Sequence, residues 1–272
     1  MIKCYFLLIS IVIFLIFLIL LFNYIYNTNY IHNYIYENIY ITQKEDYSNY
    51  NDIYENDNII YVTPNEAYNN IINNNYIDNF NDVDIKVRNC NNIEDCKKLY
   101  KKNIKLFTEK EKIILKKLVN KSNIKIKNFT SFFRVPWKFV RITNKIDNGL
   151  PHTHNDTIYL SDLFFENPSI EIIIHEKIHI YQKLNPSKSD KLYKEYNFKK
   201  IKRNNNKEAN NNRRANPDLN DYDYKKNNKI IYSVYKDNAK SLSDIKLVNS
   251  NKESNINEHP DEYFAYKISK KI

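Results

Sequence analysis

The chain has 272 residues and a formal net charge of +10 at pH 7, and it contains one glycine, seven proline and 24 tyrosine residues. That length suits one large domain or two small ones with a buried core. The abundant Asn, Ile, Lys and Tyr have AT-rich codons, so the bias reflects the genome and not a prion-like tract. Lysine is spread along the chain without a zinc finger, RNP signature or helix-turn-helix pattern. A solvated surface is therefore favoured over a nucleic-acid partner.

The N-terminus predicts a membrane anchor. Residues 4–22 are apolar apart from Ser10, and a run of this length can span a lipid bilayer. Lys3 precedes the run, and the next lysine or arginine is Lys44. The positive-inside rule therefore places the N-terminus in the cytosol and the C-terminal domain on the lumenal or extracellular side. No small-x-small cleavage site follows, which favours an uncleaved signal-anchor over residues 1–23. A cleaved signal peptide, which would give a secreted protein, is the alternative.

Residues 24–58 lack clear periodicity and are predicted to form a stalk or linker, and residues 59–122 a helical N-terminal portion. The elements expected in that portion are a helix opened by a capping box at Thr63–Glu66, a short strand at Asp84–Arg88, a helix over Ile93–Tyr100 and a helix opened by a second capping box at Thr108–Glu111. Cys90 and Cys96 could form a local disulfide in an oxidising compartment, and two free thiols are the alternative.

Residues 123–272 mix strand and helix signals, which predicts an α+β domain. Strands are expected at Ile124–Ile126, Trp137–Ile142 and Thr157–Leu160. Ser169 is placed to cap a helix that runs to about Leu184 and is apolar nearly all round, so this helix is expected to be buried.

A polar insertion is predicted around residues 187–255. The expectation there is a helical extension followed by a loop, with a strand or short helix at Ile230–Tyr235. After the insertion, Pro260 opens a final helix.

The buried helix carries the motif His175-Glu176-Lys177-Ile178-His179. Residues four apart share one face of a helix, so both imidazoles can reach one ion. Glu176 can contact a water on that ion. Two histidine ligands with an adjacent carboxylate are typical of a hydrolytic zinc site. Lys177 is expected on another side of the helix.

A catalytic zinc usually has a third protein ligand and a water. Glu262 is the candidate, because it lies in the first turn of the final helix beside apolar Phe264 and Ala265. The alternative is that this acidic residue binds no metal and only interacts favourably with the dipole at the helix N-terminus. The alternatives for the third ligand are Glu258, His259 and Asp261.

The motif together with Glu262-Tyr263-Phe264-Ala265 resembles zincin metallopeptidases of the gluzincin type, in which glutamate is the third ligand, and more distantly the anthrax lethal factor-like group. A closer resemblance is to zinc metalloproteases of large nucleocytoplasmic DNA viruses. It covers roughly residues 80–272 and is carried by Pro151-His152-Thr153-His154, Ile158-Tyr159-Leu160-Ser161, Tyr181-Gln182, Asn216-Pro217-Asp218 and His259-Pro260-Asp261-Glu262.

This resemblance implies a zincin-like α+β domain, with a small mixed sheet, a helix bearing the HExxH motif and a later helix bearing the glutamate. It implies His175, His179 and Glu262 as ligands of one zinc ion and Glu176 as general base. It also implies that the strand before the zinc helix, Thr157–Leu160 by position, borders the cleft and pairs with an extended substrate. The lethal factor-like group has an acid where this chain has Tyr266, so that supporting carboxylate is not expected here.

Further polar residues are candidates for the cleft. His152 and His154 share one side of an extended segment and could line the cleft or bind a second metal, or they could be hydrogen-bonded turn residues. Asp218 could orient a zinc-binding histidine or belong to a turn. The donor that stabilises the oxyanion could be any of Tyr222, Tyr224, Tyr266 and His259.

The sequence thus predicts a membrane-anchored zinc metallopeptidase that acts on polypeptides, held in the bilayer by residues 4–22 and with no nucleic-acid partner. The alternative is a catalytically inactive, membrane-tethered zincin-fold protein with a structural or binding role, such as a virion membrane component. Cleavage specificity, removal of the N-terminal portion as a prodomain, and oligomeric state are not encoded in any pattern we recognise.

Overall fold

The computed structural model describes residues 59–129, 135–203, 212–248 and 259–272. The predicted anchor and stalk lie outside these residues. No helix in the described part of the chain is long and apolar enough to cross a bilayer.

A mixed five-stranded sheet lies at the centre of the fold. Its order is β1-β3-β5-β4, and β2 pairs with the far end of β3 on the same side as β1. Strands β1, β3 and β5 are parallel, while β2 and β4 run antiparallel to their neighbours. The strands are β1 (Ile59–Tyr61), β2 (Ile104–Lys105), β3 (Trp137–Ile142), β4 (His152–His154) and β5 (Thr157–Leu160).

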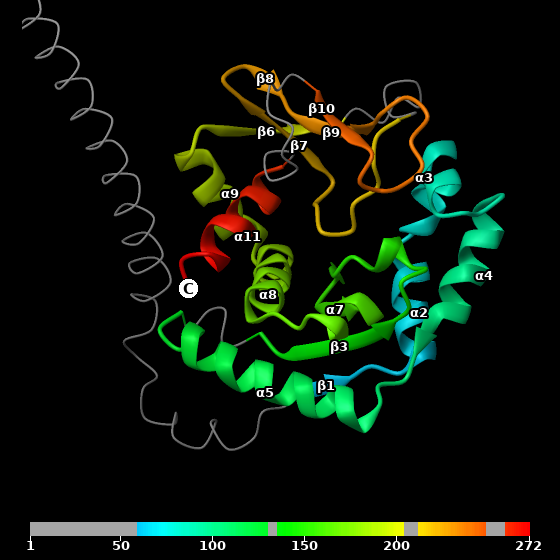
Figure 1. Cartoon of the computed structure of the whole chain (residues 1–272). Coiled ribbons are helices and arrows are strands. Elements are labelled where there is room, and N and C mark those ends of the chain that lie inside the picture. Colours follow the sequence, from blue (N-terminus) through cyan, green and yellow to red (C-terminus); the bar gives the residue numbers. More distant parts are fainter. Residues whose placement is uncertain (1–58, 130–134, 204–211, 249–258) are drawn as a thin grey trace, which may run out of the picture.

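Helices cover both faces of this sheet, which explains why β3 and β5 are apolar on both sides. On one face, Phe139 and Leu160 pack in a core with α5 (Glu109–Ile126) and α8 (Ile170–Leu184). On the other face, Val140 and Tyr159 pack against α2 (Pro64–Asn73) and α4 (Ile93–Asn103). Figure 1 shows α5 along the base of the molecule, α8 in the middle and α2 with α4 to one side.

The remaining elements are short helices and two small sheets. They are η3 (Ile77–Asn79), α3 (Asp82–Val87), η4 (Asp147–Gly149), α7 (Asp162–Glu166), α9 (Pro186–Glu195) and α11 (Pro260–Ser269), with a three-stranded sheet of β6 (Phe198–Lys202), β7 (Tyr222–Lys226) and β8 (Lys229–Ile230) and a pair of β9 (Tyr232–Tyr235) and β10 (Ile245–Val248). The predicted α+β class is confirmed.

Several local predictions are confirmed with their physical causes. The capping box at Thr108–Glu111 is present and opens α5. Thr63 caps α2 with Pro64 at the first position. The side chain of Ser169 accepts from the backbone N–H of Ile172 and opens α8, which ends at Leu184. Cys90 and Cys96 form a disulfide.

The strand predicted at Asp84–Arg88 is wrong, because this segment lies in and just after helix α3. Asn81 caps that helix, and Asp84 completes a capping box by accepting from the backbone N–H of Asn81. Arg88 then pairs with Asp84 one helical turn away. The alternation of charged and apolar residues was too short to distinguish the two periods.

The strand predicted at Ile124–Ile126 is also wrong, because these residues are the last turn of α5. The buried positions Leu115, Val119, Ser122 and Ile126 follow the helical period, whereas Ile124 is 65% exposed. The boundary expected after residue 122 therefore falls inside a helix.

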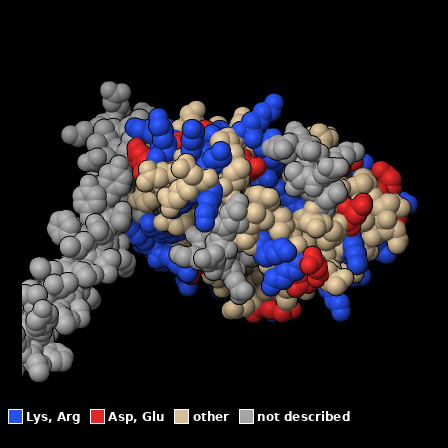
Figure 2. Space-filling model, turned by 90° about the horizontal axis from the view of Figure 1, so that it is seen from above, with Lys and Arg blue, Asp and Glu red and all other residues tan. Residues whose placement is uncertain are grey.

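The polar insertion is more structured than predicted. Its described residues form α9 and strands β6 to β10, where the sequence suggested a helical extension and loops. Tyr232–Tyr235 is a strand, which decides between the two alternatives stated for that segment. On the face shown in Figure 2, lysine and arginine side chains are interspersed with acidic and uncharged residues.

A matched pair of substitutions tests the course of α5. Ile126→Ala should lower the free energy of unfolding by about 2–4 kcal/mol, because Ile126 is 1% exposed in the core. Ile124→Ala should change it by less than ~0.5 kcal/mol. In a strand, Ile124 and Ile126 would face the same side, so both variants would lose similar amounts of unfolding free energy. Similar losses measured by chemical denaturation would therefore contradict the helix.

Candidate metal centre

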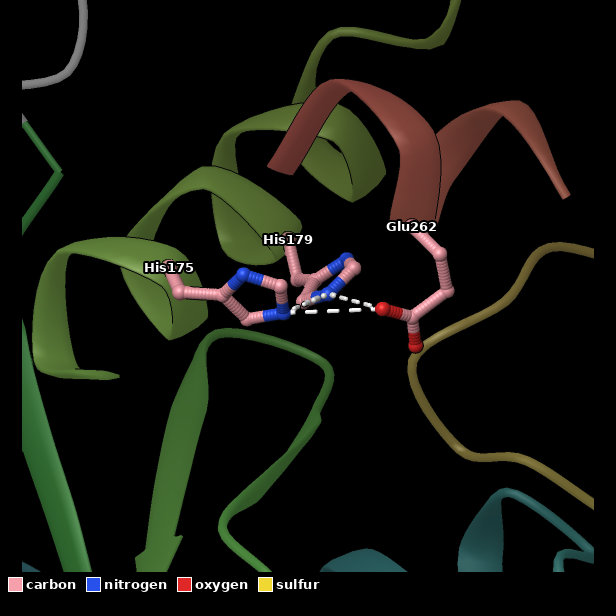
Figure 3. Close-up of side chains that lie close together, drawn as sticks. All are labelled: His175, His179 and Glu262. Carbon is pink, nitrogen blue, oxygen red and sulfur yellow. Dashed lines mark hydrogen bonds and ion pairs between the residues drawn. The ribbon is translucent and has the colours of Figure 1, made fainter. Parts of the chain in front are cut away.

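The ligands come together because α8 and α11 pack side by side. Phe264, Ala265 and Ile268 of α11 share a core with Ile174 and Ile178 of α8. His259 caps α11 through its side chain, and Pro260 occupies the first turn. Glu262 is thereby held in the first turn of α11, facing the histidines of α8. Figure 3 shows the three side chains converging from the two helices.

The distances fit one metal ion. Nε2 of His175 and Nε2 of His179 are 3.0 Å apart. Oε2 of Glu262 is 3.5 Å from the first of these atoms and 3.7 Å from the second. Ligand atoms about 2.0–2.2 Å from a tetrahedral ion lie roughly 3.3–3.6 Å from one another, and the three distances lie on both sides of this range. In the described part of the chain, His175, His179 and Glu262 form the one group of this kind that could hold a metal.

Neighbouring amides orient two of the ligands. Nε2 of Gln182 donates to the carbonyl oxygen of Asp261 at 3.0 Å, which turns Oε1 of Gln182 towards His179. Nδ1 of His179 therefore donates to that oxygen at 3.0 Å, so Nε2 faces the cluster and is the atom that can present a lone pair to an ion. Asn216 donates through Nδ2 to Oε1 of Glu262 at 3.2 Å and leaves Oε2 for the cluster.

Sequence reasoning assigned no role to Gln182 or Asn216. Gln182 follows His179 by three residues on the same helix, a spacing that could have indicated the contact. Asn216 reaches Glu262 from a distant segment, and no local pattern reveals it.

Charge pairing stabilises the ligands inside the protein. Burial would raise the pKa of Glu262, but the charge of His179 and hydrogen bonds from both histidines hold that pKa well below its usual value. Burial would lower the pKa of His179, but the Glu262 and Asp218 carboxylates raise it to about 9. Without a metal, these shifts favour a protonated His179 beside an ionised Glu262, and a metal ion would replace that proton.

Glu176 is buried beside the ligands, and its Oε2 has no hydrogen-bond partner among the described residues. Burial raises the pKa of Glu176 well above its usual value, and the Asp218 carboxylate raises it further, while His179 opposes the shift. A buried polar atom without a partner is costly. An ion-bound water or substrate at this place would satisfy it.

A cleft of about 570 Å³ opens at the ligands. Its wall includes Glu176, Tyr266 and the segment Arg214–Asp218. The ring of Tyr266 lies edge-on to His175, with the centroids 4.4 Å apart. Burial, with the nearby Glu262 and Glu176 carboxylates, raises the pKa of Tyr266 to about 12, so its phenol is protonated near neutral pH.

The other candidate residues have different neighbours. Nδ1 of His259 accepts from the backbone N–H of Asp261, and its Nε2 lies 3.2 Å from the carbonyl oxygen of Tyr222, so this histidine caps α11. The sequence suggested that Asp218 orients a zinc-binding histidine. Instead, Oδ1 of Asp218 accepts from the backbone N–H and the hydroxyl of Thr153.

The two histidines of β4 do share one side of the strand, as expected. The ring of His152 stacks on Tyr159, and the ring of His154 lies edge-on to it. His152 belongs to the cleft wall, and His154 is not among the described residues of that wall. Burial, with the charge of His152, lowers the pKa of His154 well below its usual value. Lys177 lies over the ring of Trp137, with Nζ 3.8 Å from the ring centroid, away from the metal-facing side as expected.

The prediction that Thr157–Leu160 pairs with substrate is wrong, because this strand has no unpaired edge. It forms β5, which pairs with β3 on one side and with β4 on the other. The strand at the edge of the sheet is β4, His152–His154. The sequence order suggested β5 because it precedes α8, but strand pairing places β4 outside it.

No protein-family model, curated protein or solved structure matches this chain, so its function has to be inferred from its own residues.

Metal titration tests the centre. The purified protein should bind one equivalent of Zn²⁺ by calorimetry, and Glu262→Ala should weaken that binding by more than about 100-fold. Gln182→Ala should weaken Zn²⁺ binding by about 10–100-fold, which is the usual effect of losing a partner that orients a ligand. Glu171→Gln is the control, because Glu171 lines the same cleft without belonging to the ligand group. Equal affinities for the Glu262→Ala and Glu171→Gln variants would refute the assignment.

Proposed function

We propose that the protein is a zinc-dependent metallopeptidase. The observation that carries the proposal is the convergence of His175, His179 and Glu262 with Glu176 at the end of a cleft. Two imidazoles and one carboxylate are a ligand set typical of catalytic zinc, and three protein ligands leave a coordination position open. Bound zinc would supply an acidified water and a polarised carbonyl group.

Glu176 is proposed as general base. Its raised pKa suits a group that takes a proton from the attacking water and then delivers it to the leaving amine. The apolar core beneath α8 fixes the helix, so the carboxylate is held beside the ligands. A buried carboxylate oxygen that has no hydrogen-bond partner among the described residues, next to three metal ligands, favours catalysis over a purely structural metal site.

Tyr266 is proposed as the donor that stabilises the oxyanion. Of the four candidates from the sequence, it is the one that lines the cleft next to a ligand. The hydroxyl of Tyr224 donates to Asp190, and His259 is occupied in capping α11. Tyr222 lies on β7 and is 42% exposed. A phenol whose pKa is about 12 keeps its proton for donation near neutral pH.

The proposal places the catalytic domain outside the cytosol, tethered by residues 4–22. The disulfide between Cys90 and Cys96 supports an oxidising compartment, because such bonds are rare in the cytosol. The inactive, tethered alternative remains the competing function, and activity separates the two.

The Glu176→Gln variant tests the mechanism. It should bind Zn²⁺ within about threefold of the unmodified protein, and its hydrolysis of a mixed peptide library should fall by at least about 100-fold, because the base is removed and the ligands stay. Mass spectrometry of the library measures the cleavage, with Glu171→Gln as the control. Full turnover by Glu176→Gln would eliminate the mechanism. A zinc-loaded native protein that cleaves no peptide would favour the inactive alternative.

A further inference from the structure

The edge strand β4 has one residue whose backbone groups face outward. In the antiparallel pairing of β4 with β5, Thr153 lies opposite Ile158 between two flanking pairs. Backbone groups of successive residues point to opposite sides of a strand. Because the N–H of Thr153 points away from β5, the N–H and C=O groups of His152 and His154 face β5. Thr153 therefore offers the outward donor and acceptor of this short edge.

Both of these backbone groups are already occupied. The N–H of Thr153 donates to Oδ1 of Asp218 at 2.6 Å, and its hydroxyl donates to the same oxygen at 2.9 Å. Nζ of Lys183 donates to the carbonyl oxygen of Thr153 at 2.8 Å and to its hydroxyl. Thr153 is fully buried. One acid and one base thus occupy the outward-facing backbone groups of the edge.

The segment that carries Asp218 is fixed at both ends. We call residues 214–218 the strap. The N–H of Ala215 donates to Asp84 and its carbonyl oxygen accepts from Arg88, both of which are buried. Just after the strap, the N–H of Asn220 donates to Asp261 in the first turn of α11.

The strap also crosses the space between the metal ligands and the edge strand. Asn216 contacts Glu262, and Asp218, two residues later, contacts Thr153. A peptide that added to β4 as a further strand would have to displace Asp218 and Lys183. Strand addition requires unpaired N–H and C=O groups at the edge.

We propose that Asp218 and Lys183 determine which peptides the cleft accepts, by closing the edge of β4 against extended polypeptides. The inference rests on the proposed peptidase function. The substrates are then short peptides or locally bent segments, recognised around the scissile bond and by their side chains. Adding residues along β4 gives no further binding. An open edge would instead offer the N–H and C=O groups of Thr153 to any peptide long enough to reach them.

Asp218→Ala should open the edge, and Asp218→Asn is its matched control. The asparagine side chain keeps an oxygen that can accept from Thr153, whereas alanine removes it. Lys183→Met is a second opening variant that retains the aliphatic bulk. Hydrogen exchange at the Thr153 amide reports the closure directly, without metal or activity. Exchange should be slow in the native protein and in Asp218→Asn, and faster in Asp218→Ala.

Peptide binding supplies the second measurement. The probes are oligo-alanines of one to five residues with a hydroxamate at either end, which anchors them to the zinc-loaded protein. From one to five residues, affinity for the native protein and Asp218→Asn should change less than about threefold, and affinity for Asp218→Ala and Lys183→Met should rise at least about tenfold.

A tenfold rise with length in the native protein would overturn the proposal. So would unchanged exchange at Thr153 in Asp218→Ala, or the absence of a length effect in both opening variants. Failure of even the shortest hydroxamate to bind the native protein would count against the zinc site, and exchange at Thr153 would still decide whether Asp218 closes the edge.

Discussion

The contact between α8 and α11 is the constraint on which the site depends. Its apolar side chains join the main core, and its polar side chains form the ligand group. A carboxylate and two imidazoles inside a protein are costly to bury unless they are paired. Oε2 of Glu262 lies 3.5 Å from Nε2 of His175 and 3.7 Å from Nε2 of His179, and this pairing shifts the pKa values of Glu262 and His179 in opposite directions. Because the imidazoles and the carboxylate lie close together, they stabilise each other without a metal. In the same arrangement they can offer three ligand atoms to one ion.

A second buried network joins the N-terminal helices to the cleft. Arg88 forms ion pairs with Asp84 and Asp147 and donates to the carbonyl oxygen of Ala215 in the strap. Buried charges of this kind are a weak source of stability but a strong penalty when one partner is lost. Because β1 and β2 also pair with β3, and Tyr76 and Arg88 line the cleft, residues 59–108 are integral to the sheet and to the wall of the cleft.

The sequence predicted the parts that depend on local chemistry. Helix α8, its cap at Ser169, the spacing of His175 and His179, and Glu262 beside Pro260 all follow from neighbouring residues. One error is local: at Asp84–Arg88, alternation over a few residues was outweighed by the capping box of Asn81 and Asp84. Other errors arise where distant contacts decide. Asn- and Lys-rich stretches concealed strands β6 to β10, whose partners are needed to recognise them. The contact between Asp218 and Thr153 joins residues 65 apart in the sequence, so no local pattern contains it.

The central claim is that one zinc ion is held by His175, His179 and Glu262. The most direct measurement is anomalous diffraction at the zinc absorption edge from crystals of the zinc-loaded protein. The account predicts a single peak about 2.0–2.2 Å from Nε2 of each histidine and from a carboxylate oxygen of Glu262. A peak elsewhere, or a peak at the histidines with Glu262 turned away, would contradict it.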